Sequence, residues 1–163
     1  MRIQTLFVTF FGTGFSPKAP DTLATLAALL LGSAVLHYLG METLFMLAFG
    51  VTVIGIFEIN KYANGSKEEC RREIVIDKAA GVWLSLMIAS STAATMHYPY
   101  AEILAVALGF AALRLFDSWK PSTIGWLERE VKGGLGIMLS ALLAGMAGGL
   151  LGVVVLRGIQ SIM

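Results

Sequence analysis

Charged residues are scarce in this sequence of 163 residues. Asp, Glu, Lys and Arg together make up only 14% of it, whereas hydrophobic residues make up 56%. A soluble domain usually carries about 25% charged residues, so this chain lacks the polar side chains that a water-exposed surface requires. The composition therefore argues against a soluble domain and predicts an integral membrane protein. At this length we expect a single membrane domain over residues 1–163.

Cysteine is almost absent as well. The single one, Cys70, excludes an internal disulfide. Its neighbours at 67–69 and 71–72 are all charged, and a cysteine-type metal site needs several ligands, so we interpret Cys70 as a surface thiol. The segment 1–11 has one basic residue and then an apolar stretch, but no clear small-residue cleavage site. We therefore do not predict a removed signal peptide.

Long runs without charge mark the expected membrane spans, because a crossing helix needs about 20 mostly apolar residues. Three runs contain no Asp, Glu, Lys or Arg: 22–41, 79–101 and 133–156. Two shorter runs, 43–57 and 103–113, each follow an expected outer turn and can complete a crossing with flanking residues. The sequence predicts an all-α, polytopic helical membrane bundle of about five spans. The segment 3–15 is too short to cross and is expected to lie in the interface or to re-enter the membrane.

Basic residues gather in alternate connections between these runs. They precede the first span and fill the second-to-third and fourth-to-fifth connections, whereas the turns at 37–42 and 97–102 hold no Lys or Arg. The positive-inside rule places the basic connections in the cytoplasm. We expect a multi-pass protein of the bacterial inner (cytoplasmic) membrane with its charged residues on the cytoplasmic side: Arg2, Lys18, Lys61, Lys67, Arg71, Arg72, Lys78, Arg114, Lys120, Arg129 and Lys132.

Small residues crowd the last span. Gly145 pairs at small-xxx-small spacing with both Ala141 and Gly149. Such spacing lets helix backbones approach closely inside a membrane. We favour packing within one chain over dimerisation, and the oligomeric state stays open.

Three polar segments lie at the expected cytoplasmic boundary. The segment 12–22 has glycines and prolines for irregular backbone, Lys18, and Asp21 or Thr22 as an N-cap of the first span. A helix start beside a lysine is also a plausible phosphate cradle, although capping alone explains Thr22. The segment 73–83 places Glu73 and Asp77 four residues apart, on one face if it is helical.

Asp77 and Lys78 then enter the membrane edge, where ionisable groups are usually paired or functional. In the third segment, Arg114, Asp117 and Lys120 follow directly from an apolar run that Pro121 ends or bends. Arg and Lys are the natural partners of phosphate oxygens. If the three segments converge, they form a site suited to an anionic lipid headgroup in the inner leaflet.

At these motifs the chain resembles the phosphatidylglycerophosphatase A family, bacterial membrane phosphatases that convert phosphatidylglycerol phosphate to phosphatidylglycerol. The resemblance covers nearly the whole chain, and four motifs occur together in family order. They are GTGFSPKAPDT at 12–22, EIVIDKAAGVW at 73–83, LFDSWKP at 115–121 and GGLGIMLSALLAG at 133–145. The resemblance implies Mg²⁺-dependent hydrolysis of a phosphomonoester at the cytoplasmic face.

The resemblance also implies roles for particular residues. Asp77 and Asp117 are the expected metal ligands or base, and Lys120 joins them as a catalytic residue. From their own chemistry and position in the polar segments, the expected substrate-binding residues are Lys18, Thr22, Arg114 and Lys78. The chain departs from the family pattern at several glycines and acids. Asp21 and Ala24 stand where the family usually has glycines, Lys78 stands in place of Glu in an Asp-Glu pair, and Ser140 with Ala141 replaces an Asp-Asp pair.

Two interpretations follow from these departures. In the first, Lys78 supplies the positive charge of a metal and the chain still binds or hydrolyses its phospholipid. In the second, the chain is a catalytically inactive homologue that binds anionic lipid or serves as a structural membrane protein. In both, the expected partners are a membrane and an anionic phospholipid, and not a nucleic acid.

Overall fold

The computed structural model describes residues 3–12, 20–63, 75–96, 99–119 and 122–162. In this part of the chain all regular secondary structure is helical. The helices are α1 (Ile3–Val8), α2 (Pro20–Leu39), α3 (Met41–Ala63), α4 (Ile76–Ala93), α5 (Ala101–Trp119), α6 (Ser122–Glu130) and α7 (Gly134–Ile162). The predicted all-α class is confirmed. Three of these helices, α2, α3 and α7, are long and apolar enough to cross a membrane.

The helices do not end where the charge-free runs end. One helix is shorter than its run, and another is longer. The run 79–101 is not one helix, because α4 ends at Ala93 and a turn follows, in which the Met96 N–H donates to the Ala93 carbonyl oxygen at 2.9 Å. Conversely, α5 continues to Trp119, well past the run 103–113. Helix α2 begins at Pro20, so the prediction of Asp21 or Thr22 as its N-cap is wrong. Proline suits the first helical position because the N–H that it lacks has no partner there.

The N-terminal segment forms one short helix. Six residues of α1 span about 9 Å, too little to cross a bilayer. A turn follows with positive φ at Phe10 (46°), Phe11 (59°) and Gly12 (89°), and Phe10 is buried. Residues 13–15, the rest of the segment predicted to lie in the interface or re-enter, lie outside the described residues.

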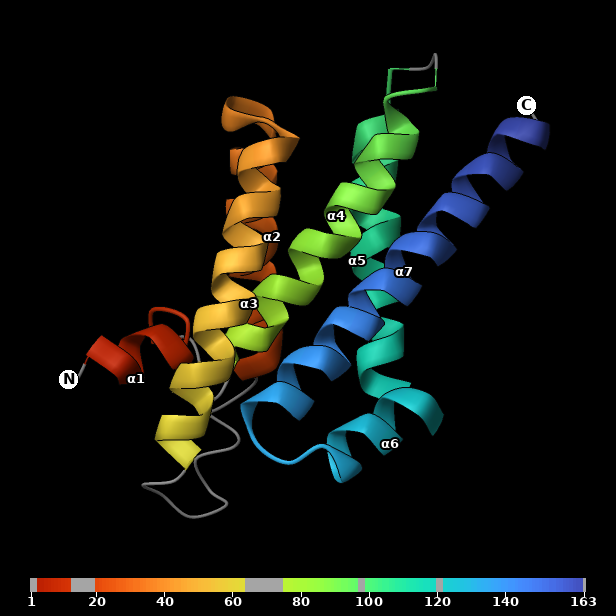
Figure 1. The fold of residues 1–163 in the computed structure, drawn as a ribbon. Helices are drawn as coiled ribbons and strands as arrows, with labels where there is room; N and C mark the ends of the chain where they lie inside the picture. The colour runs from red at the N-terminus through yellow and green to blue at the C-terminus, as the bar shows by residue number, and fades with distance from the viewer. Residues whose placement is uncertain (1–2, 13–19, 64–74, 97–98, 120–121, 163) are drawn as a thin grey trace.

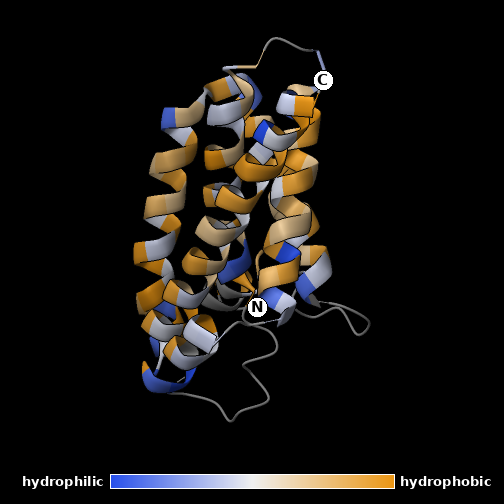
Figure 2. Ribbon diagram, turned by 90° about the vertical axis from the view of Figure 1, so that its right-hand side faces the viewer, coloured by the Kyte–Doolittle hydropathy of each residue, from blue (hydrophilic) through white to orange (hydrophobic). Residues whose placement is uncertain are grey.

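Helix α4 is the centre of the bundle. It packs against α2, α3, α5 and α7, and most of its residues are buried. Figure 1 shows α2 and α3 on one side of α4, with α5 and the slanting α7 on the other. Large apolar side chains remain exposed on the outer helices, among them Leu30, Phe49 and Val154. Figure 2 shows apolar residues along the helices and hydrophilic ones mainly towards their ends. An apolar exterior of this extent is typical of a surface that faces lipid.

Small residues bring α7 very close to α4 and α5. A Cβ atom on Gly145 would collide with the Gly81 carbonyl oxygen, and one on Gly148 would lie 2.7 Å from the Leu113 nitrogen. The start of α7 is fixed by α3, since the Asn60 side-chain oxygen accepts a hydrogen bond from the Gly134 N–H at 2.7 Å. The small-residue face of α7 thus packs within the chain.

Candidate functional site

Five predicted site residues come together from three helices. Asp77 and Lys78 lie in the first turn of α4, Arg114 and Asp117 near the end of α5, and Thr22 in the first turn of α2. They meet because α4 and α2 start at the end of the bundle where α5 finishes (Figure 1). The other two predicted residues, Lys18 and Lys120, lie outside the described residues, as does Glu73.

The ammonium group of Lys78 is the centre of this cluster. Its Nζ atom lies 3.1 Å from Asp77 Oδ2 and 3.0 Å from Asp117 Oδ1. The three side chains are largely buried, with exposed fractions of 13% for Lys78, 7% for Asp77 and 16% for Asp117. A lysine ammonium has three N–H donors, so two are directed at carboxylates and one remains for another acceptor.

Arg114 extends the cluster towards the surface. Its Nη1 lies 3.9 Å from Asp117 Oδ2, and its Nη2 donates a hydrogen bond to Thr22 Oγ1 at 3.1 Å. The Arg114 side chain is 30% exposed, about twice as much as the side chains of Lys78 and Asp117. Asp117 therefore holds both cations, one on each carboxylate oxygen, and the guanidinium is the more accessible of the two.

One oxygen of Asp77 has no hydrogen-bond partner among the described residues. Its Oδ1 atom is buried and makes no hydrogen bond within the described part of the chain, while Oδ2 contacts Lys78. Buried polar atoms are nearly always hydrogen-bonded, so such an exception calls for an explanation. In a site that handles phosphate, a free carboxylate oxygen is an acceptor available for a water molecule or a proton.

Helix α7 supplies a wall that the residue-level prediction did not include. A small cavity of about 10 Å³ beside the ion pair is lined by Lys78, Gly81, Leu113, Asp117, Ala141 and Ala144. Position 141 therefore faces the cluster, whereas the Ser140 hydroxyl donates to the Ile137 carbonyl oxygen of its own helix at 2.8 Å. The motif at 133–145 pointed to this stretch, but an alanine carries no chemical signal that would have placed it in the site.

The described residues do not fit the Mg²⁺ ion that the resemblance implies. Mg²⁺ prefers six oxygen ligands in near-ideal octahedral geometry and usually retains several waters. In the described part of the chain, no three His, Cys, Asp or Glu side chains gather closely enough to hold a metal ion. Lys78 already contacts one oxygen of each carboxylate, and the adjoining cavity has room for about one water at most.

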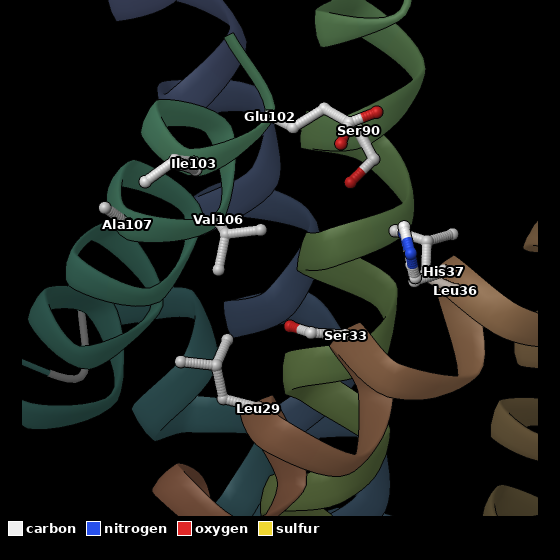
Figure 3. Close-up of a pocket in the computed structure, with 9 residues that line it drawn as sticks. All are labelled: Leu29, Ser33, Leu36, His37, Ser90, Glu102, Ile103, Val106 and Ala107. Atoms are coloured by element: carbon white, nitrogen blue, oxygen red, sulfur yellow. The ribbon is translucent and has the colours of Figure 1, made fainter. Parts of the chain in front are cut away.

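A second, larger cavity lies further along the same helices. It measures about 660 Å³ and lies between α2 and α5, with Ser90 of α4 contributing to its lining (Figure 3). Leu29 and Ser33 line it from α2, and Ile103 and Val106 from α5. Leu29 follows Thr22 by seven residues, or about 10 Å along the helix. Its other lining residues include His37 and Glu102, so the cavity has both apolar and polar walls and extends towards the end of the bundle opposite the charged cluster.

Comparison with known proteins gives one consistent result. The family described as Phosphatidylglycerophosphatase A matches residues 6–156. The Escherichia coli protein named Phosphatidylglycerophosphatase A is 31% identical over 86% of this chain and 76% of its own length. The Haemophilus influenzae protein of that name is 30% identical over 85% of this chain and 80% of its own length.

A relative with a different name matches equally well. The Bacteroides thetaiotaomicron protein named Putative phosphatidylinositol-3-phosphatase is 32% identical, and the match covers 88% of this chain and 87% of the relative. No solved structure matches the chain significantly. The family match covers almost the whole chain and includes every residue of the charged cluster, so this chain belongs to the phosphatidylglycerophosphatase A family of lipid phosphatases.

Proposed function

We propose that this chain hydrolyses the phosphate monoester of phosphatidylglycerol phosphate at the cytoplasmic surface of the bacterial inner membrane, releasing phosphatidylglycerol and inorganic phosphate. The observation that carries this proposal is the cluster of Asp77, Lys78, Asp117, Arg114 and Thr22 at one end of an apolar helical bundle. A cluster there can meet a lipid headgroup while the acyl chains stay in the bilayer.

The names of the relatives all refer to a phosphorylated lipid, which supports a lipid phosphate as the substrate. Two relatives are named for phosphatidylglycerophosphate and one for phosphatidylinositol 3-phosphate. Both names describe a phosphate monoester on a phosphatidyl lipid. The phosphate is therefore the group that the site must recognise, and the remaining headgroup decides between the two substrates.

The cluster offers a role for each side chain. Arg114 has the planar fork that suits phosphate oxygens, and it is the more exposed cation. We assign to Asp77, whose buried Oδ1 atom makes no hydrogen bond to a described residue, the role of the base that accepts a proton from the attacking water. The water oxygen bonds to phosphorus, the bond from phosphorus to the lipid oxygen breaks, and the proton passes to that oxygen, so the lipid leaves as an alcohol. Lys18 and Lys120 remain predicted phosphate contacts, and no step here involves Mg²⁺.

The 660 Å³ cavity suits an acyl chain of the same lipid. It begins about 10 Å along α2 from Thr22 and continues past Ser33 towards His37. A lipid with its phosphate at Arg114 would place the far part of an acyl chain at this depth. Leu29 of α2 and Val106 of α5 would then contact that chain, while the polar lining residues His37 and Glu102 lie further towards the opposite end of the bundle (Figure 3).

We further propose five membrane crossings. Beside the three long apolar helices, α4 and α5 contain 18 and 19 residues. Each is close to 30 Å long, about the thickness of the hydrocarbon core. Both lie alongside α7 in Figure 1. Five crossings with the basic connections in the cytoplasm place the charged cluster at the inner surface.

The proposed reaction is tested by phosphate release from purified protein in mixed micelles. Phosphatidylglycerol phosphate and phosphatidylinositol 3-phosphate are supplied separately, with phosphatidylglycerol as the blank. We expect release from the first, and a loss of about 100-fold or more for Asp77→Asn, as for removal of a general base. Glu42→Gln is the matched control, because Glu42 is an exposed acid at the start of α3. No release from either lipid would favour the lipid-binding, non-catalytic interpretation.

A further inference from the structure

Lys78 occupies the position that a bridging metal ion would need. Its Nζ atom lies 3.1 Å from one carboxylate and 3.0 Å from the other, so the ammonium joins Asp77 to Asp117 as a divalent ion would. The lysine backbone adjoins Asp77 in the same helical turn, and the second carboxylate comes from α5. The positive charge between the acids is therefore part of the polypeptide.

The described surroundings of Lys78 leave little room for a second cation. Gly81, Leu113 and Ala141 line the space beside Lys78, and this cavity measures about 10 Å³. A divalent ion placed there would need the two oxygens that Lys78 already contacts. It would also lie within a few Å of a like charge, and such repulsion is strong away from bulk water.

Asp117 connects Lys78 to Arg114, the residue that we propose binds phosphate. One of its oxygens contacts Lys78 and the other faces Arg114, so the two cations are held side by side. Lys78 retains one N–H donor after its two carboxylate contacts. Two adjacent cations with free donors are the arrangement that a phosphate group can bridge.

We propose that Lys78 is a built-in cation that replaces a divalent metal ion in this chain, so that the site neither binds Mg²⁺ nor requires it. The part of this proposal that concerns phosphate rests on the function proposed above. The part that concerns metal exclusion does not, because it is a property of the protein without lipid. The two parts are tested separately.

Metal exclusion is measured on the full chain in detergent, without lipid, by titration with Mn²⁺ followed by electron paramagnetic resonance. We expect the spectrum of free Mn²⁺ for the unmodified protein. Lys78→Glu replaces the ammonium with a third carboxylate and should bind Mn²⁺ at least about tenfold more tightly, since affinity for such ions follows the charge of the ligands. Lys61→Glu carries the same charge change at an exposed position of α3 and should not bind.

Two outcomes would overturn the proposal. The first is Mn²⁺ binding by the unmodified protein that Asp77→Asn or Asp117→Asn abolishes. The second is a Lys78→Glu protein that unfolds cooperatively on heating but still fails to bind, because Lys78 would then not be what keeps the metal out. If Lys78→Glu does not fold, Lys78→Met takes its place, and the titration of the unmodified protein decides the first outcome in any case.

Phosphate release is then compared in EDTA and in Mg²⁺. We expect equal rates for the unmodified protein and a loss of about 100-fold for Lys78→Met, in the range found when one charge-stabilising group is removed. A rate that EDTA abolishes and Mg²⁺ restores would contradict metal independence. Absence of release under both conditions would count against the proposed reaction, while the Mn²⁺ titration would still decide whether the site excludes metal.

Discussion

At the scale of single residues, Lys78 joins two helices at the candidate site. It neutralises Asp77 and Asp117, two acids that lie largely out of solvent. Leaving buried charges without their partner is strongly destabilising. The contact that we propose prepares the site for an anion therefore also holds α4 to α5.

The first prediction concerns the loss of this ammonium. Lys78→Met keeps most of the side-chain volume but leaves two carboxylates facing each other. The free energy of unfolding should fall by about 3 kcal/mol, the lower end for a broken buried ion pair. Chemical denaturation in detergent measures this value. Lys132→Met, at an exposed lysine, is the control and should stay within about 0.5 kcal/mol. Equal effects of the two substitutions would contradict the buried ion pair.

A second prediction concerns a hydrogen bond between helices. The Trp83 indole N–H donates to the Ala28 carbonyl oxygen at 2.9 Å and joins α4 to α2. Trp83→Phe removes the donor and keeps an aromatic ring, so stability should fall by about 1 kcal/mol. Trp126→Phe removes an indole that is 55% exposed and should change stability much less. The same denaturation experiment compares them, and no difference would argue against the α2–α4 contact.

At the scale of helices, the crossing of α7 over α4 depends on glycine. Gly145 packs against the Gly81 backbone, so any side chain at 145 must push the helices apart. Gly145→Leu should destabilise the protein by about 3 kcal/mol or more, as for severe overpacking. It should also lower activity, because α7 carries the Ala141 wall of the site. Gly158→Leu is the matched control, since nothing lies within 4 Å of a Cβ atom there. A tolerated Gly145→Leu would mean that α7 packs elsewhere.

Helices could be predicted from charge-free runs, but their ends could not. The length of such a run reflects the thickness of the hydrocarbon core of the membrane. A helix can continue beyond that core into the polar surface region. Arg114 and Asp117 continue α5 as partners three residues apart. Where the chain does turn, between α4 and α5, the signal is local: the Thr95 hydroxyl donates to the Thr92 carbonyl oxygen at 2.7 Å. Such short polar bonds carry little weight in a hydropathy pattern.

The candidate site, too, could be predicted only in part. The sequence could predict that Asp77, Arg114 and Asp117 lie close together. Charged residues at helix ends on the same side of the membrane all lie near one membrane surface. The sequence could not indicate that Lys78 would point between the two acids, because adjacent positions in a chain do not fix a distance to a third residue. Nor could it identify Ala141 as a wall, since an apolar residue in an apolar helix is indistinguishable from its neighbours.

At the scale of the whole molecule, orientation is open to a direct test with the native cysteine. Cys70 belongs to the basic connection between α3 and α4, which we expect in the cytoplasm. A membrane-impermeant maleimide should therefore label it in inverted membrane vesicles and not in intact spheroplasts. In a Cys70→Ser background, Tyr38→Cys at the exposed end of α2 should label with the opposite preference. Labelling of Cys70 from outside would reverse the proposed topology.

The charged cluster stands at the end of helices whose outer surfaces are apolar. If this cluster is the site of lipid hydrolysis, we expect the substrate to arrive by lateral diffusion within its own leaflet. The quantity that governs turnover is then the mole fraction of the phospholipid among its neighbours, not its amount per volume of solution. Dilution with inert lipid should slow the reaction, whereas adding water to the same vesicles should leave it unchanged.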